Sequence, residues 1–419
     1  MFRMAMVCLL VLSSFSFGQS PTQPTPQANP GPQPPPPPQP PPMTLVKKSV
    51  VFIEGTYPRR SPDDRCFDAE NKPSNICTII GTGFLLFYPD KRLRENRGFS
   101  YLVTNKHMVR EPSLDGALGK GKFLQTISVR INTKKPLQDG GVSFSFGQLP
   151  VTFQGGDLYA FVDPVDPQVD LAIINISLNQ ETLDFFTIQP SIFATKILIK
   201  DKKLDESNEV VFAGLFAPFT GNLRNYPIVR HGKLAMMSEE RIPWEPGVTE
   251  DLFLADVMSF GGNSGSPVFI RTGGDNQVIG NYEYFLLGVM QGFYSTDSKV
   301  SVQTAELNGV AKENTGVAAV VPADKIVEIL ESPRAASRRD MQVANLLAEK
   351  GNLKDAIELY KTAIDRLTKF DKYHPDLILT KMAYAAVLEK SGDKTGSARE
   401  TAEANAIKRP EPQDDNDKK

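Results

Sequence analysis

Between residues 44 and 331 the chain is divided into short apolar runs by glycine, proline, asparagine and aspartate, and this pattern limits the fold more than any other feature. The runs are rich in Val, Ile and Phe, which favour half-buried strands. They read SVVFIEG, IIGTGFLLFY, SYLVTN, LAIINIS, EVVFAGLF, YFLLGVMQGF and GVAAVV. No long helices alternate with them, which argues against a doubly wound sheet. The pattern therefore predicts an all-β domain.

From residue 332 to about 408 the composition becomes rich in Ala, Leu, Glu and Lys. The stretch PADKIVEIL predicts a helix at the end of the β region, residues 356–367 show helical periodicity, and Pro375 suits the first turn of a further helix. Two stretches echo each other, LLAEKGNLKDAIELYKTA and AVLEKSGDKTGSARETA, and they resemble the longer tetratricopeptide repeat of kinesin light chains. Fewer than two full units are present, so this small all-α domain should pack on the β domain or on another chain. The alternative is a plain helical hairpin without a binding role.

The two ends of the chain differ from these domains. Residues 1–18 combine an early arginine, a short apolar run and small residues, which predicts a secretory signal peptide. The alternative, an uncleaved membrane anchor, would need about 20 apolar residues. Proline makes up 13 of the 22 residues from 21 to 42, so segment 19–43 is interpreted as an extended spacer, with a ligand for a proline-recognising domain as the alternative. Residues 409–419 are expected to be a disordered tail.

The charge balance and the cysteines indicate which partners and which kinds of site to expect. The 47 basic side chains nearly balance the 49 acidic ones, which disfavours nucleic acid as a partner. After export, Cys66 and Cys77 could form a disulfide, the alternative being two unpaired thiols in a loop. Neither cysteine has the CxxC spacing of a zinc site, so no metal is expected. We expect an exported protein, periplasmic or secreted, with no membrane span after signal cleavage.

The residues that could perform acyl transfer are few. A serine nucleophile needs a base, a carboxylate that orients the base, and N–H donors for the oxyanion. Ser264 lies between glycines in GGNSGSPVF, and His107 follows an apolar run in YLVTNKHMV. Asp170, which opens the run DLAIINIS, is the best acid. The other two histidines are better explained by a barrel strand or turn (His231) and by helix capping or packing (His374).

Five motifs together resemble the trypsin-like serine peptidases, in particular bacterial exported forms related to the HtrA group. They are GTGFLL from residue 81, LVTNKHMV, VDLAII, GGNSGSPVF and NTGVAAVVP, and the similarity spans most of residues 44–331. It implies a double β-barrel, chymotrypsin-like fold and a reaction that needs no cofactor. It also implies Ser264 as the nucleophile, His107 as the general base and Asp170 as the orienting carboxylate, with the N–H groups of Gly262 and Ser264 as the oxyanion hole.

The resemblance also indicates where a substrate would bind. It places Met258 near the floor of the primary pocket and Gln291, Gly292 and Phe293 along one wall. None of these positions holds an acidic residue, so we expect the substrate to carry an apolar side chain before the scissile bond. The chain departs from the family pattern at Ser266, where glycine is usual, and at Met108, where cysteine is frequent. No PDZ domain is recognisable.

Two other motifs fit less well. Residues 262–266 approach the GxSxG elbow of α/β-hydrolases, but the last glycine is absent and only a histidine in the helical segment follows. Residues 116–122 have P-loop spacing, but Phe123 stands where serine or threonine must hold magnesium. The expected function is therefore an exported serine endopeptidase acting on protein or peptide, with a possible protein partner at the helical repeat. The alternative is an inactive protease-fold scaffold.

Overall fold

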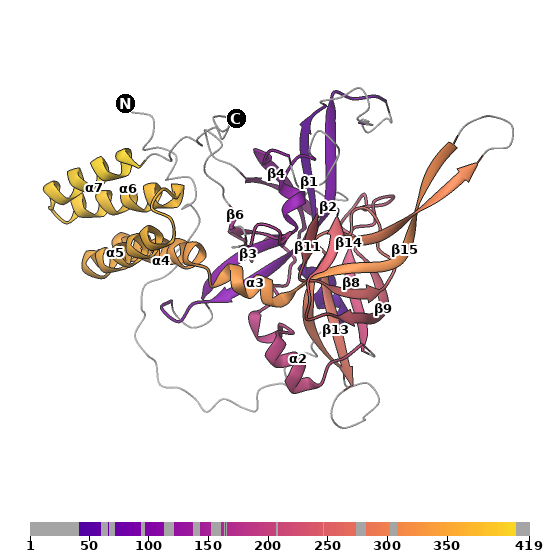
Figure 1. Ribbon diagram of the computed structural model, residues 1–419. Coiled ribbons are helices and arrows are strands. Elements are labelled where there is room, and N and C mark those ends of the chain that lie inside the picture. Colours follow the sequence, from indigo (N-terminus) through magenta and orange to yellow (C-terminus); the bar gives the residue numbers. More distant parts are fainter. Residues whose placement is uncertain are drawn as a thin grey trace, which may run out of the picture. The chain divides into compact units, whose positions relative to one another are not determined.

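The computed structural model confirms the predicted fold class, which is mainly β with a following all-α part (Figure 1). The described residues are 42–407, apart from 60–65, 67–71, 94–96, 113–120, 137–142, 152–160, 163, 165, 207, 246, 274–281 and 302–307. The expected signal peptide, proline-rich spacer and C-terminal tail lie outside them. None of the described helices is long and apolar enough to cross a membrane.

The first part of the fold is a seven-stranded antiparallel sheet with the order β5-β4-β1-β2-β3-β7-β6. It is preceded by helix α1 (Pro42–Ser49). Its strands are β1 (Val50–Pro58), β2 (Ile76–Pro89), β3 (Gly98–Thr104), β4 (Thr126–Asn132), β5 (Phe144–Pro150), β6 (Phe161–Val162) and β7 (Ala172–Ile176). The double-barrel expectation needs one refinement here, because the strand order of this sheet is open while that of the second sheet is closed.

Apolar side chains cover both faces of this first sheet, which explains its continuous apolar runs. On β1, Val51 and Ile53 enter one core together with Leu85 and Leu102. The alternate residue Phe52 enters the other core, which the sheet shares with the second sheet and the first C-terminal helices. A strand buried on both faces reads as a run rather than as an alternation of polar and apolar residues.

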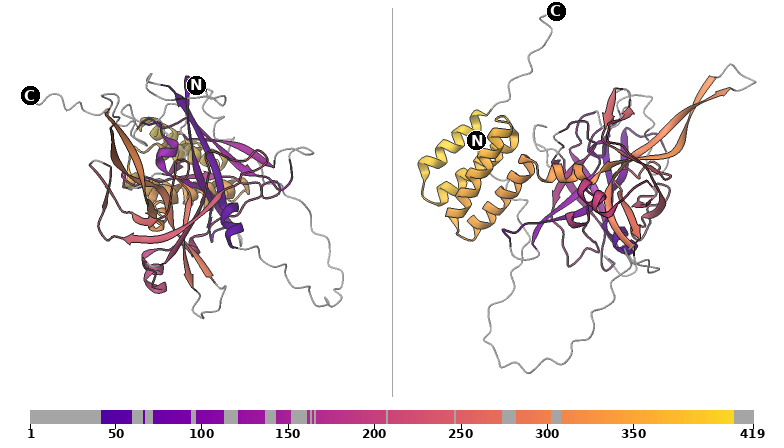
Figure 2. Two further views of the ribbon diagram at one scale, coloured as in Figure 1. Left: turned by 90° about the vertical axis from the view of Figure 1, so that its right-hand side faces the viewer. Right: turned by 60° about the horizontal axis from the view of Figure 1, so that its bottom comes forward.

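The second part of the fold is a closed six-stranded barrel with the order β12-β15-β14-β13-β8-β9. Its strands are β8 (Glu209–Gly214), β9 (Ile228–Met237), β12 (Phe253–Asp256), β13 (Pro267–Gly273), β14 (Tyr282–Ser301) and β15 (Asn308–Pro322). Its core is formed by alternate residues such as Phe212, Ile270 and Leu287. The β14–β15 ribbon extends beyond the barrel (Figure 2). Strands β10 (Ile242–Glu245) and β11 (Val248–Glu250) form a separate two-stranded ribbon, and helix α2 (Lys196–Lys202) precedes β8.

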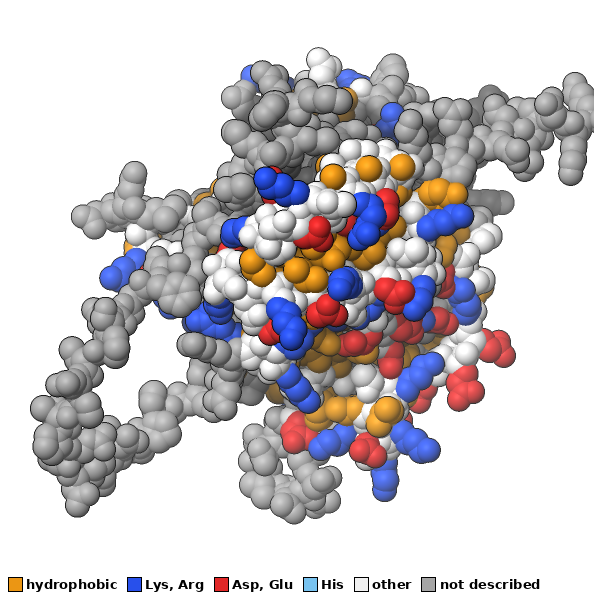
Figure 3. Space-filling model, turned by 90° about the vertical axis from the view of Figure 1, so that its left-hand side faces the viewer, with side chains coloured by type: hydrophobic (Ala, Val, Ile, Leu, Met, Phe, Trp, Pro, Cys, Tyr) orange, Lys and Arg blue, Asp and Glu red, His pale blue; other side chains and the backbone are white. Residues whose placement is uncertain are grey.

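The C-terminal part is a set of helices whose ends follow local sequence signals. They are α3 (Ala323–Leu330), α4 (Pro333–Glu349), α5 (Leu353–Phe370), α6 (Pro375–Lys390) and α7 (Lys394–Ala406). Ser332 caps α4, and the Nδ1 atom of His374 caps α6 by accepting from the N–H of Asp376, as the sequence suggested. Acidic and basic side chains are mixed over the molecular face in Figure 3. Within the protein, Asp376 is buried and binds the guanidinium groups of Arg334 and Arg338.

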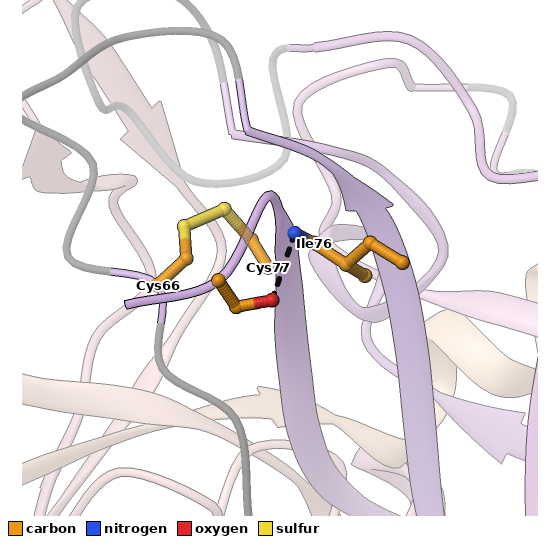
Figure 4. The surroundings of a disulfide bond; sticks show 4 residues. Cys66, Ile76 and Cys77 are labelled. Carbon is orange, nitrogen blue, oxygen red and sulfur yellow. Dashed lines mark hydrogen bonds between the residues drawn. A yellow bond between two sulfur atoms is a disulfide. The ribbon is translucent and has the colours of Figure 1, made fainter. Parts of the chain in front are cut away.

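Cys77, the second residue of β2, forms a disulfide with Cys66, which lies before the strand (Figure 4). Beside it, the N–H of Ser74 donates to the carbonyl of Cys66, and the hydroxyl of Ser74 accepts from the N–H of Ile76 at 3.0 Å. The disulfide and these contacts join Cys66 and Ser74 to the start of β2, the longest strand of the first sheet.

Candidate active site

His107 and Asp170 come together at the ends of two neighbouring strands. β3 ends at Thr104, and the short 3-10 helix η1 (Lys106–Val109) then turns the chain and carries His107. Asp170 stands just before β7, the strand that pairs with β3. The carboxylate of Asp170 accepts the N–H of His107 at 2.9 Å and lies 2.5 Å from Nδ1 of its ring. Asp170 therefore fixes both the backbone and the ring of His107.

This contact sets the protonation of the pair. Burial raises the pKa of Asp170, but the charge and hydrogen bonds of His107 outweigh it, and the net pKa is lowered. Burial lowers the pKa of His107, but the charge and hydrogen bond of Asp170 raise it above its usual value. Since an ionised carboxylate only accepts hydrogen bonds, Nδ1 carries the proton, and in the neutral ring Nε2 is left as a proton acceptor. Among the hydrogen bonds of the described residues, Nε2 has no partner.

Ser264 lies in a backbone arrangement that glycines on both sides make possible. Gly262 and Gly265 have φ angles of +94° and +86°, which side-chain-bearing residues rarely adopt. Across the part of the chain that the structure describes, neither the N–H of Gly262 nor that of Ser264 donates to a protein acceptor. Two neighbouring N–H groups without a protein partner, beside a serine, form an arrangement that can bind a developing oxyanion.

Thr82, on β2 of the first sheet, joins the serine segment to the rest of the site. Its N–H donates to the carbonyl of Ser264 at 2.9 Å, and its hydroxyl donates to the carbonyl of Gly262 at 2.7 Å. The same hydroxyl accepts from the N–H of Leu215 at 2.9 Å, while its carbonyl accepts from the hydroxyl of Thr104 at 2.8 Å. Thr104 is the last residue of β3, directly before the turn that carries His107. The histidine and serine segments are therefore fixed to one buried residue.

Met108 and Ser264 also approach one another at Gly81. A Cβ atom at Gly81 would lie 2.6 Å from the sulfur of Met108 and 3.3 Å from the carbonyl oxygen of Ser264. The residue after His107 and the carbonyl of Ser264 thus flank the same glycine. The hydroxyl of Ser264, however, donates to the carbonyl of Gln291 at 3.0 Å rather than to His107. A hydrogen bond to His107 would require rotation of the serine side chain.

Ser266, where glycine is usual in the resembling family, has no backbone strain, and its buried hydroxyl has no hydrogen-bond partner among the described residues. It is fully buried, and a Cβ atom at Gly214 would lie only 2.2 Å from its hydroxyl oxygen. The side chain of Ser266 therefore fills the space that Gly214 leaves. Its N–H donates to the carbonyl of Asn263, and its carbonyl accepts from Met290. The tight loop around Ser264 is thus closed by regular hydrogen bonds.

Of the residues expected to contact substrate, Gln291, Gly292 and Phe293 lie on β14, where Gln291 binds the hydroxyl of Ser264, and Met258 lies in the segment after β12. Gln291 is buried, and Gly292 lies beneath Trp244, whose ring would be 3.1 Å from a Cβ atom at that position. Met258 is 46% exposed, and its sulfur would lie 3.7 Å from a Cβ atom at Gly316. Phe293 follows Gly292 on β14 and is partly exposed. Met258 is thus a partly exposed apolar side chain beside Gly316.

The sequence interpretation missed Glu250, which is buried at the end of β11. Its carboxylate accepts from the side-chain amide of Gln291 at 3.0 Å. Burial raises its pKa to about 7, and the charge of Asp170 adds to this, while Gln291, Lys106 and Arg241 act in the opposite direction. Thr82 and Trp244 were missed as well. Thr82 belongs to GTGFLL, one of the five motifs named from the sequence. The motif does not reveal, however, which distant segments this threonine binds in the folded chain.

The remaining candidates from the sequence lie elsewhere. His231 is on β9, where its ring binds Glu209, as expected for a barrel-strand residue. Most of the P-loop-like stretch lies outside the described residues, and Phe123 lies beneath the guanidinium of Arg110. Within the described part of the chain, no group of three or more His, Cys, Asp or Glu side chains is arranged to hold a metal ion.

Comparisons with known proteins give likenesses of fold only. No protein-family model and no curated protein matches the sequence. Among solved structures, the chain is similar to Deg5, with a TM-score of 0.34 and 16% identity over 68% of this chain and 88% of that chain. It is also similar to the inactive form of a Ser-to-Ala mutant of Rv3671c from M. tuberculosis H37Rv, with a TM-score of 0.32 and 16% identity over 70% of this chain and 96% of that chain. The geometry of the site, rather than these likenesses, supports the function proposed below.

Glu250 should make stability depend on pH. Between pH 4.5 and about pH 7 the folded chain keeps a proton that the unfolded chain has released, so the free energy of unfolding should fall as pH rises. The Glu250→Gln variant has no carboxyl group to titrate at this position. Its free energy of unfolding, relative to wild type, should therefore rise by up to about 3 kcal/mol between pH 4.5 and about pH 7. Urea unfolding of both proteins at pH 5, 6, 7 and 8 measures the difference. Parallel curves would contradict the buried, protonated carboxyl.

Proposed function

We propose that the chain is an exported serine endopeptidase, and the observation that carries this proposal is the His107–Asp170 pair, whose segment is joined to that of Ser264 through Thr82. Asp170 holds the ring so that Nε2 can accept a proton, and the free N–H groups of Gly262 and Ser264 suit an oxyanion. In the proposed reaction the hydroxyl of Ser264 attacks the peptide carbonyl. Its proton moves to Nε2 of His107 and then to the leaving amine, and water releases the acyl group in a second round.

The substrate would bind as an extended peptide along β14, with its acyl part at Gln291, Gly292 and Phe293. The side chain before the scissile bond would enter the surface around Met258, where an apolar group fits better than a cation. The helical segment 332–408 would bind a protein partner or position the substrate. Export is supported by the signal-like N-terminus and by the Cys66–Cys77 disulfide, which is typical of oxidising compartments.

Reaction of the mature chain with a fluorophosphonate probe tests the proposed nucleophile. We expect one adduct, located on Ser264 by peptide mass spectrometry, and its loss in Ser264→Ala. His107→Ala should slow labelling by at least 100-fold, because the base that activates the hydroxyl is gone. Ser295→Ala, at an exposed serine of β14, is the control and should label like wild type. Absence of labelling in folded wild-type protein would favour the alternative, an inactive protease-fold scaffold.

Exchange of a single residue tests the primary pocket. Wild type should cut a peptide library after large apolar residues, whereas Met258→Asp should prefer Arg or Lys at that position by at least tenfold, since an acid would now face the cation. Met236→Asp, on β9, introduces the same acid at another exposed methionine and should keep the apolar preference. Efficient cleavage after arginine by the wild type would refute the assignment of Met258.

A further inference from the structure

The segment between β8 and β9 is unusual because it exposes large apolar side chains. This 215–226 loop reads LFAPFTGNLRNY. Phe216, Phe219, Leu223 and Tyr226 have exposed fractions of 39%, 51%, 55% and 46%. The rings of Phe219 and Tyr226 stack with their centroids 6.3 Å apart. A cluster of exposed apolar groups within one loop often marks a binding surface.

This loop is held in place by buried polar contacts with the first sheet. Asn225 is 4% exposed, and its amide donates to the carbonyl of Arg130 on β4, while its N–H donates to the side-chain oxygen of Asn132 at 2.7 Å. The guanidinium of Arg130 in turn donates to Thr220 and to the carbonyl of Gly221. The loop leaves the barrel at β8 and is fastened to β4, so its exposed side chains are presented on a fixed backbone.

The same loop is continuous with the candidate oxyanion hole. The carbonyl of Leu215 accepts from the side-chain amide of Asn263, the residue directly before Ser264. A Cβ atom at Gly262 would lie 2.7 Å from Leu215 and 3.6 Å from the Cβ atom of Ala217. The start of the loop therefore packs directly against the segment that carries the free N–H groups.

The position of the loop relative to Ser264 indicates which part of a substrate it would meet. Under the proposed function, the acyl part of the substrate lies along β14, on the side where Ser264 contacts Gln291. The leaving part must then pass across the other side, where Gly262 meets Leu215 and Ala217. Because the loop begins there and continues toward β4, the residues after the scissile bond would run along its exposed face.

We propose that the 215–226 loop forms the subsites for the leaving part of the substrate and selects large apolar residues after the scissile bond. This inference rests on the proposed function. Its chemistry follows from the composition of the loop, whose one charged residue, Arg224, binds the carboxylate of Asp184 at 3.1 Å. The exposed rings and Leu223 offer apolar contact, whereas the single cation of the loop is already paired with Asp184.

Competition between water and added amines for the acyl-enzyme tests this inference. A small ester whose acyl group lies on the β14 side forms the acyl-enzyme, and an amino-acid amide then attacks its carbonyl. The new amide bond forms as the bond to the oxygen of Ser264 breaks, and the proton of the amine passes through His107 to that oxygen. The ratio of aminolysis to hydrolysis reports binding on the leaving side alone.

We expect phenylalanine amide to give a ratio at least tenfold above those of glycine amide and aspartic acid α-amide at equal concentration. Phe219→Ser should reduce the phenylalanine ratio at least fivefold and leave the glycine ratio within twofold. Phe370→Ser, which alters an exposed phenylalanine on α5, is the matched control and should behave like wild type. Both changes affect exposed side chains, and circular dichroism would verify that the variants are folded.

The possible failures can be told apart. An acyl-enzyme that shows equal ratios for all three amides, or an unchanged ratio in Phe219→Ser, would overturn this inference and leave the proposed function intact. Absence of any acyl-enzyme would overturn both. If Phe219→Ser instead abolishes binding to phosphatidylcholine vesicles, or converts a dimer to a monomer, with the ratios unchanged, the loop serves a lipid surface or a second copy of the chain, and the inference is wrong.

Discussion

Four hydrogen bonds converge on Thr82, and the arrangement of the candidate site depends on them. Through its backbone and hydroxyl, this fully buried threonine binds Ser264 and Gly262 of the serine segment, Leu215 after β8, and Thr104 at the end of β3, which are three separate segments. Through these bonds the serine segment of the barrel and the histidine segment of the first sheet share one buried attachment. A buried hydroxyl that both donates and accepts is also costly to replace, because each partner would be left unsatisfied.

Burial and neighbouring charge determine the protonation of two carboxyl groups at the candidate site. Asp170 and Glu250 are neighbouring carboxyl groups that behave differently. Asp170 is stabilised as an anion by His107, whereas Glu250, deprived of water, tends to keep its proton. Glu250 also fixes the side chain of Gln291, whose backbone carbonyl binds the hydroxyl of Ser264. The acceptor that holds the serine hydroxyl is thus itself held by a group that titrates near neutral pH.

Much of the fold could be predicted because local sequence and burial agree. All seven apolar runs named from the sequence lie in strands, and the helices around Ile326, Ala356 and Pro375 were expected from periodicity and capping. The strands absent from that set, such as β9 with its exposed His231 and Lys233, carry polar residues on one face and lack a long apolar run. The open order of the first sheet depends on long-range pairing, which local patterns do not encode.

In the candidate site, too, residues in local motifs could be predicted, whereas residues that depend on distant neighbours could not. Motifs pointed to His107, Asp170 and Ser264, and the structure joins the first two directly. The loop glycine Gly262 could be singled out because its conformation is a local property. Glu250, Trp244 and the 215–226 loop could not, since their relevance comes from neighbours distant in the sequence. The fit of Ser266 against Gly214 is likewise a property of two strands that only the folded chain brings together.

The rate of fluorophosphonate labelling in two Thr82 variants tests the central claim most directly. Thr82→Ser keeps the hydroxyl, and it should label Ser264 within about threefold of wild type. Thr82→Val keeps the shape but leaves the carbonyl of Gly262 and the N–H of Leu215 unpaired, at a cost of about 1–3 kcal/mol for each group. If Thr82 holds the nucleophile and the oxyanion hole in place, labelling of folded Thr82→Val should be at least 30-fold slower. Equal labelling rates in the Val and Ser variants would contradict the account.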